Sequence, residues 1–135
     1  MVTITMEYRG GLRCQAKHAP SSTLLVTDAP VDNQGKGESF SPTDLVATAL
    51  GTCMLTTMGI VAQRHGWSME GASATVVKEM VADPVRRIGR LRVRLVLPAA
   101  LEPAAREALE RAARTCPVHR SLGKDVDIPL ELVWA

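Results

Sequence analysis

The sequence predicts an α+β fold in which one long, buried helix is surrounded by short strands. Three observations support this prediction: a capped, uncharged stretch in the first half of the chain, period-two alternation on both sides of it, and a second, amphipathic helical pattern. The predicted order of elements is β-β-β-α-β-β-α-β. At 135 residues the chain is expected to form one domain, 1–135.

The long uncharged stretch begins and ends like a helix. Ser41 can serve as N-cap, Pro42 suits the first helical position, and Asp44 completes an S-x-x-D capping box. Gly66 stands where a left-handed residue commonly ends a helix. No residue between positions 45 and 62 is charged, so we expect a helix buried on every side. The stretch just reaches membrane-span length, but its threonines, glycines and caps favour a core helix.

Alternating apolar and polar residues predict the strands, which we place at 2–7, 12–17, 23–27, 72–81, 88–97 and 126–134. A second helix should run from residue 102 or 103 to about residue 114, with one more turn over 117–122. The strand at 88–97 carries three arginines on one face. We interpret them as a solvated sheet face rather than a phosphate site.

The predicted central helix is too long for the rest of one chain to cover. It would measure roughly 36 Å, and six short strands with one further helix offer little surface to pack on it. We therefore expect an intimate homodimer, in which a second copy of the chain supplies the remaining cover.

Composition and charge exclude several classes of partner. The net charge is only +2 and the arginines are spread along the chain with acids between them, which argues against nucleic acid. The first ten residues resemble a strand and lack the apolar segment of a signal peptide. We therefore expect a cytoplasmic protein with no membrane partner, whose cysteines Cys14, Cys53 and Cys116 are reduced at rest.

The cysteines are the residues most able to carry chemistry. Cys116 precedes Pro117 at a predicted helix start, where free N–H groups and the helix dipole lower a thiol pKa. Cys53 lies mid-helix in apolar surroundings that raise its pKa, and alone it would be interpreted as a small core residue. Local sequence therefore makes Cys116 the more ionised thiol. Cys14 alternates within a predicted strand, and we interpret it as structural.

A zinc site is an alternative for the same residues. Cys116 and His119 have ligand spacing, and Cys53 could join them. His65 could not, because twelve helical residues separate it from Cys53 by about 18 Å. The sequence shows no P-loop, dinucleotide fingerprint, serine elbow or carboxylate dyad.

Two motifs resemble those of a known family. S-P-T-D-L-x-x-x-A-L-G-T-C at 41–53 and C-P-V-H-R-S-L at 116–122 are similar to motifs of the OsmC/Ohr family, the osmotically inducible protein C and organic hydroperoxide resistance proteins. The resemblance implies an intertwined α+β homodimer that answers oxidative stress by reducing organic hydroperoxides. It makes Cys53 the peroxidatic and Cys116 the resolving cysteine, with a dithiol as reductant and no metal or organic cofactor.

The resemblance also implies an arginine that ionises the peroxidatic thiol. Arg9 is the closest match at the end of the first strand, and Arg13 is the second candidate. In the hydroperoxide reductases a glutamate directly after the motif's proline holds this arginine. Thr43 stands at that position here and Asp44 follows it. Asp44 could replace the glutamate, although helix capping is the role we favour for it.

The substrate side of the expected site is apolar. Leu50, Met54, Leu55 and Met58 surround Cys53 in sequence and would favour organic peroxides, although core packing explains them equally well. The main alternative to a peroxidase is a structural or ligand-binding protein of the same fold, in which Thr43 has removed the arginine clamp.

Overall fold

The computed structural model describes all residues from 1 to 135 and confirms the α+β class, with two sheets and one long helix. The chain forms two compact units, an N-terminal unit (Met1–Val46) and a C-terminal unit (Ala47–Ala135). The long helix α1 (Pro42–His65) begins in the first and continues into the second.

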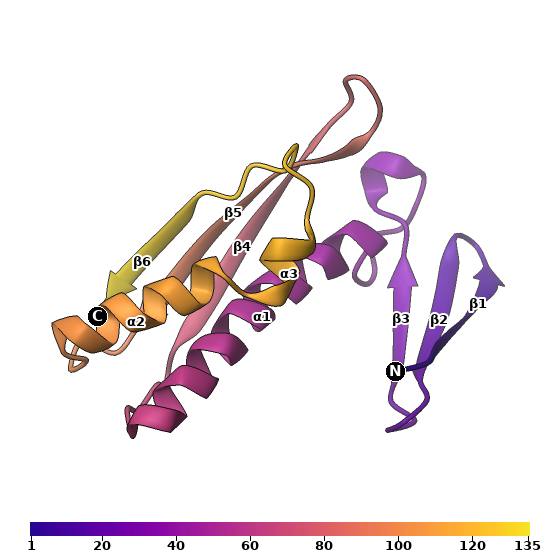
Figure 1. Cartoon of the computed structure of the whole chain (residues 1–135). Helices are drawn as coiled ribbons and strands as arrows, with labels where there is room; N and C mark the ends of the chain where they lie inside the picture. Colours follow the sequence, from indigo (N-terminus) through magenta and orange to yellow (C-terminus); the bar gives the residue numbers. More distant parts are fainter. The chain divides into compact units, whose positions relative to one another are not determined.

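The N-terminal unit contains a three-stranded antiparallel sheet in the order β1-β2-β3 (Figure 1). Its strands are β1 (Ile4–Gly10), β2 (Arg13–His18) and β3 (Leu24–Asp28). All three were predicted, each beginning one or two residues early. The segment between β3 and α1 contains a single 3-10 turn, η1 (Val31–Asn33).

One face of this sheet is apolar and exposed. The register places Ile4, Met6 and Tyr8 of β1 on the same face, opposite His18, Ala16 and Cys14 of β2. All three β1 side chains are more than half exposed. The chain itself therefore does not bury the apolar face that alternation in β1 creates.

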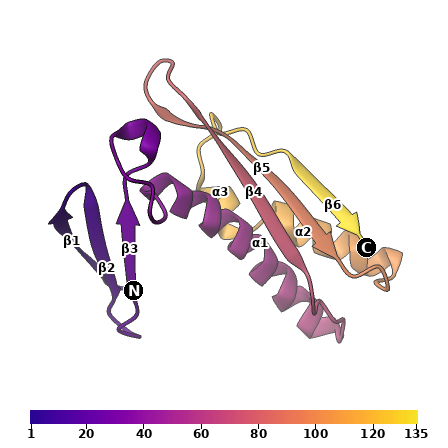
Figure 2. The ribbon, with the colours of Figure 1, turned by 180° about the vertical axis from the view of Figure 1, so that it is seen from behind.

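The C-terminal unit packs helices on one face of a second sheet, and the views from both sides agree on this arrangement (Figures 1 and 2). Strands β4 (Ser73–Val81) and β5 (Arg87–Leu97) are antiparallel, whereas β5 and β6 (Leu130–Trp134) are parallel. Helix α2 (Pro103–Arg114) and the short α3 (Pro117–Ser121) follow β5 in the chain. Strand β6 is shorter than predicted, and before it only Asp127 bridges to β5.

The core of this unit lies between the sheet and the helices. Fully buried side chains include Leu91, Val93, Leu95, Leu50, Met54, Met58 and Leu109. The alternation seen in the sequence explains the role of β5, because its leucines and valine face the helices while its arginines face away.

The arginines of β5 form ion pairs across the outer face of the sheet. Arg90 pairs with Asp127 at 2.8 Å and Arg92 with Glu79 at 2.8 Å. Arg94 also contacts a carboxylate, at 3.4 Å. The solvated sheet face expected from the sequence is confirmed, and each arginine of this row already has an anionic partner within the chain.

The predicted caps of α1 are confirmed. The Ser41 N–H donates to Asp44 Oδ2 at 2.8 Å, and the Asp44 N–H donates to Ser41 Oγ at 3.1 Å, which is a reciprocal capping box. At the other end Gly66 has φ +70°, and the Trp67 N–H donates to the Ala62 carbonyl at 2.9 Å. This Schellman arrangement fixes where the helix stops.

Within one chain α1 is not buried on every side, contrary to the sequence-based expectation. Thr48, Thr52, Thr56 and Ile60 recur at intervals of four and form one exposed strip. The opposite side is in close contact with β4, where a Cβ added to Gly51 would lie 3.0 Å from Val76 Cγ2. Helix α1 is also long and apolar enough to cross a membrane. The core helix of a soluble protein meets the same criterion.

Candidate active site

The C-terminal unit brings together two of the three cysteines. Cys53 lies in the middle of α1, and Cys116 occupies the N-cap position of α3, some sixty residues later in the chain. Their side chains interact, and both are free thiols in this structure. The pairing that the resemblance implied is therefore present in the fold. Two neighbouring free thiols are the arrangement needed to form and break an internal disulfide.

Cys116 is the buried member of the pair. Its side chain is fully buried and its Sγ accepts a hydrogen bond from the His119 N–H at 3.4 Å. Burial raises the pKa of Cys116, and the hydrogen bond and charge of Cys53 raise it further. The amides of His119 and Val118 act in the opposite direction without cancelling the burial effect. The prediction that the helix start lowers the pKa of Cys116 is therefore wrong, because burial outweighs the helix start.

Cys53 is the accessible member of the pair. It is only half-buried, although the sequence predicted that it faces protein. Its nearest polar neighbour is Thr57, one turn later, whose Oγ1 lies 4.0 Å from Sγ. Cys53 is therefore the thiol that a solute can reach, whereas Cys116 is fully buried. Cys14, by contrast, lies half-buried in β2, paired with Tyr8 and Thr27.

Both candidate arginines lie in the N-terminal unit, and their surroundings differ. Arg9 is exposed and contacts Gln15 and Glu7. Arg13 is held between two carboxylates, Asp28 and Glu38. Neither acid was predicted from the sequence, although an acid opposite an arginine in the register of two neighbouring strands was a signal that could have found Asp28.

The remaining predicted site residues take part in core packing or lie at the start of α1. Leu50, Met54 and Met58 are fully buried in the core, and Leu55 is half-buried. Asp44 completes the capping box, as expected. Thr43 Oγ1 lies 3.2 Å from Ser41 Oγ at the start of the helix.

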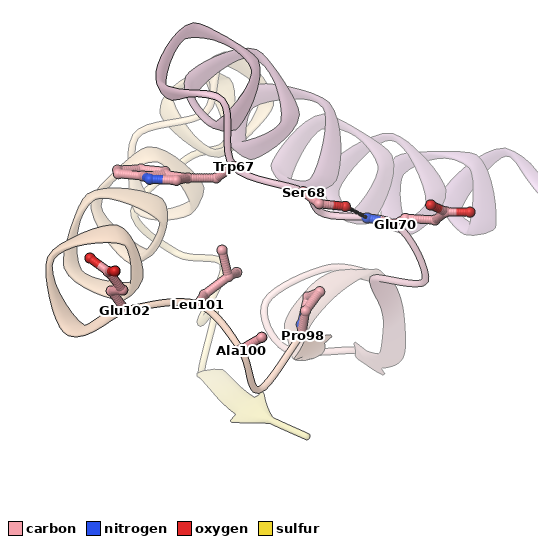
Figure 3. A pocket seen from close by; sticks show the side chains of 7 residues that line it. All are labelled: Trp67, Ser68, Glu70, Pro98, Ala100, Leu101 and Glu102. Carbon is pink, nitrogen blue, oxygen red and sulfur yellow. Dashed lines mark hydrogen bonds between the residues drawn. The ribbon is translucent and has the colours of Figure 1, made fainter.

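A pocket of about 440 Å³ lies elsewhere in the C-terminal unit (Figure 3). Trp67, Ser68 and Glu70 line one side, between α1 and β4, and Pro98, Ala100, Leu101 and Glu102 line the other, between β5 and α2. None of these residues is a cysteine or a histidine, so the pocket is not part of the thiol pair. Nowhere in residues 1–135 do three His, Cys, Asp or Glu side chains gather as metal ligands, and the zinc alternative gains no support.

Comparison with known proteins identifies the family. A family model described as OsmC-like protein matches residues 35–131, which include both cysteines of the pair. A solved structure from Psychrobacter arcticus is 42% identical to the chain, covers 98% of this chain and 96% of its own, and superimposes with a TM-score of 0.91. The chain belongs to the OsmC-like protein family. The Psychrobacter protein is provisionally described as an osmotic stress induced and detoxification response protein.

More distant members of the OsmC family share the fold. A Legionella pneumophila organic hydroperoxide resistance protein OsmC is 20% identical, with 98% and 96% of the two chains covered and a TM-score of 0.79. An organic hydroperoxide resistance protein from Elizabethkingia anophelis is 14% identical, with 100% and 96% covered and a TM-score of 0.80. No curated protein matches the chain.

Proposed function

We propose that this OsmC-like protein is a thiol-dependent peroxidase that reduces organic hydroperoxides with Cys53 and Cys116. The observation that carries the proposal is the pair itself: a half-exposed thiol on α1 interacts with a fully buried thiol whose pKa is raised. The names of the hydroperoxide resistance proteins that share the fold support the choice of substrate class.

The reaction begins with the thiolate of Cys53. It attacks one oxygen of the peroxide ROOH and breaks the O–O bond, which leaves a sulfenic acid on Cys53 and releases RO⁻, protonated to the alcohol. An arginine, Arg9 or Arg13, stabilises the thiolate and the charge that develops on the leaving oxygen. The apolar side chain of Leu55, half-buried two residues after Cys53, favours the organic part of the substrate.

The second step uses Cys116. Its thiol attacks the sulfenic sulfur of Cys53, a disulfide forms, and the sulfenic oxygen leaves as water. Burial suits Cys116 to this role, because a protonated thiol does not compete for the peroxide. An external dithiol then reduces the disulfide by exchange, is itself oxidised, and restores both thiols. A reducing cytoplasm would supply such a dithiol, and we place the protein there.

The test is a count of free thiols, made after denaturation, before and after one equivalent of an alkyl hydroperoxide. The wild-type chain has three cysteines and should lose two thiols within seconds to minutes. Cys53→Ser should keep its thiols, and Cys116→Ser should stop at a sulfenic acid that a dimedone-type reagent traps. If the wild-type protein keeps all three thiols, the peroxidase proposal fails and a non-catalytic role for the fold takes its place.

A further inference from the structure

A hydroxyl group lies one helical turn beyond the accessible thiol. Thr57 follows Cys53 by four residues in α1, so the two side chains share one face of the helix. Helical side chains lean toward the N-terminus, which carries the Thr57 hydroxyl back over Cys53. Thr57 Oγ1 lies 4.0 Å from Cys53 Sγ. Because both residues belong to one helix of the C-terminal unit, the helix itself sets this separation.

The hydroxyl of Thr57 is not bonded to the backbone. Hydroxyl groups in helices commonly donate to a carbonyl one turn earlier. Thr52, Thr115 and Ser121 each donate to the carbonyl four residues before them, at 2.7 to 2.9 Å. Thr57 makes no such bond, and the sulfur of Cys53 is its one polar neighbour in the chain. Its proton is therefore available to a group attached to that sulfur.

The separation of the hydroxyl from the sulfur suits the oxidised thiol better than the thiol itself. At 4.0 Å Thr57 Oγ1 interacts only weakly with Cys53 Sγ. In the sulfenic acid an oxygen is bonded to Sγ, and the S–O bond takes up part of the gap. An oxygen on the Thr57 side of the sulfur comes to about 2.7 Å from Oγ1, the usual length of an O–H···O hydrogen bond. The hydroxyl can then donate to the sulfenic oxygen.

The sulfenic oxygen is the leaving group of the second step. When Cys116 Sγ forms its bond to the sulfur of Cys53, the S–O bond breaks and its electron pair goes to the oxygen. The oxygen leaves as water, with the sulfenic proton and the proton of the Cys116 thiol. A hydrogen-bond donor helps most while negative charge collects on that oxygen, because hydrogen bonds to charged groups are about twice as strong as neutral ones.

We propose that Thr57 is a catalytic residue of the second step, whose hydroxyl donates a hydrogen bond to the sulfenic oxygen of Cys53 and stabilises it as it leaves. The inference rests on the proposed function and deepens it, because that function assigns this oxygen no partner. The thiol of Cys116 remains the source of the proton. Thr57 thus speeds closure of the disulfide and shortens the life of the sulfenic acid, the species that a second peroxide would oxidise further.

The experiment times the two steps separately. Protein is mixed with one equivalent of an alkyl hydroperoxide and quenched at intervals, and its thiol, dimedone-labelled and disulfide forms are counted by intact mass. Thr57→Val keeps the branched shape and removes the hydroxyl. It should slow disulfide formation about tenfold and increase the labelled sulfenic acid. In a Cys116→Ser background, where only the first step occurs, it should change the rate of peroxide attack by less than about twofold, since the hydroxyl interacts weakly with the sulfur.

Two further variants separate the effect of the hydroxyl from that of side-chain shape. Thr57→Ser keeps the hydroxyl and should form the disulfide within about threefold of the wild-type rate. Thr56→Val makes the same change at the neighbouring threonine, which is exposed and lies on the open strip of α1, and it should leave both steps unchanged.

Several outcomes would contradict this role for Thr57. A wild-type protein that loses two thiols, while Thr57→Val closes its disulfide at the same rate, defeats this inference alone. Equal slowing in Thr57→Val and Thr57→Ser, or slowing of both steps in Thr57→Val, would assign the effect to packing and would also overturn it. If the wild-type protein keeps all three thiols, the proposed function fails and this inference fails with it.

Discussion

The thiol of Cys116 interacts with that of Cys53, and the interaction raises the pKa of Cys116. The two thiols therefore do not ionise independently: once Cys53 carries a charge, ionising Cys116 places a second negative charge beside the first. The buried thiol is thereby held protonated. This order suits a pair in which one sulfur attacks a peroxide and the other condenses afterwards with the product.

The coupling predicts what removal of Cys53 does to its partner. Cys53→Ala should lower the pKa of Cys116, because the hydrogen bond and the charge of Cys53 both raise it. The pKa should stay above the ordinary cysteine value, since burial, the largest cause, remains. The ultraviolet absorbance of the thiolate measures the pKa of Cys116. In a Cys14→Ala background, the titration step of Cys116 should move to lower pH when Cys53→Ala is added. A step that stays in place would mean that the thiols are not coupled.

The Arg13–Asp28 pair predicts a pH dependence of stability. The folded-state pKa of Asp28 is lowered, so its contribution to stability is present above the unfolded-state value of about 3.9 and is lost as pH falls through the folded-state value. Asp28→Asn should therefore unfold at lower urea concentration than wild type at neutral pH, and the difference should shrink in acid. Asp125→Asn, which changes an exposed carboxylate, should follow wild type. A gap that is constant with pH would mean that the charge of Asp28 does not stabilise the fold.

The loop before α1 predicts a steric effect at one glycine. A Cβ added to Gly35 would lie 1.7 Å from the Ala29 carbonyl oxygen, so Gly35→Ala forces the backbone apart and should cost about 2 kcal/mol or more. Gly123→Ala is the matched control, because no atom lies within 4 Å of its added Cβ, and it should change stability by less than about 0.5 kcal/mol. Urea unfolding of both variants measures the difference, and equal stabilities would contradict the tight packing at Gly35.

Local rules predicted the elements of this fold well. The capping box at Ser41 and Asp44, the terminating Gly66 and the alternation through β5 each depend on near neighbours in sequence, and each is confirmed. The parallel pairing of β5 with β6 depends on residues more than thirty positions apart. Periodicity within a strand contains no information about such a pairing.

The site was harder to predict than the fold for the same reason. Helix-start rules assigned a low pKa to Cys116, but the chain folds over that thiol and burial reverses the direction. The resemblance, not local physics, paired Cys116 with Cys53. Asp28 lies just beyond the strand predicted at 23–27, and only the β2–β3 register places it opposite Arg13.

The uncovered surfaces of the chain predict its assembly. Thr48, Thr52, Thr56 and Ile60 leave one side of α1 open, which is the side that the expected second copy would cover. Burying such a strip and the apolar face of β1 would stabilise a homodimer. Light scattering should therefore give the mass of two chains for wild type. Ile60→Glu should shift the protein toward a monomer, since a charge would enter the interface.

The control for this prediction changes an exposed apolar residue outside the strip. Ala104 lies exposed on α2, so Ala104→Glu adds the same charge and should leave the mass unchanged. If wild type itself scatters as a monomer, the open side of α1 is not a subunit interface. In that case the sequence-based argument from an uncovered apolar helix is also wrong for this chain, and its threonines would suffice to keep that side in water.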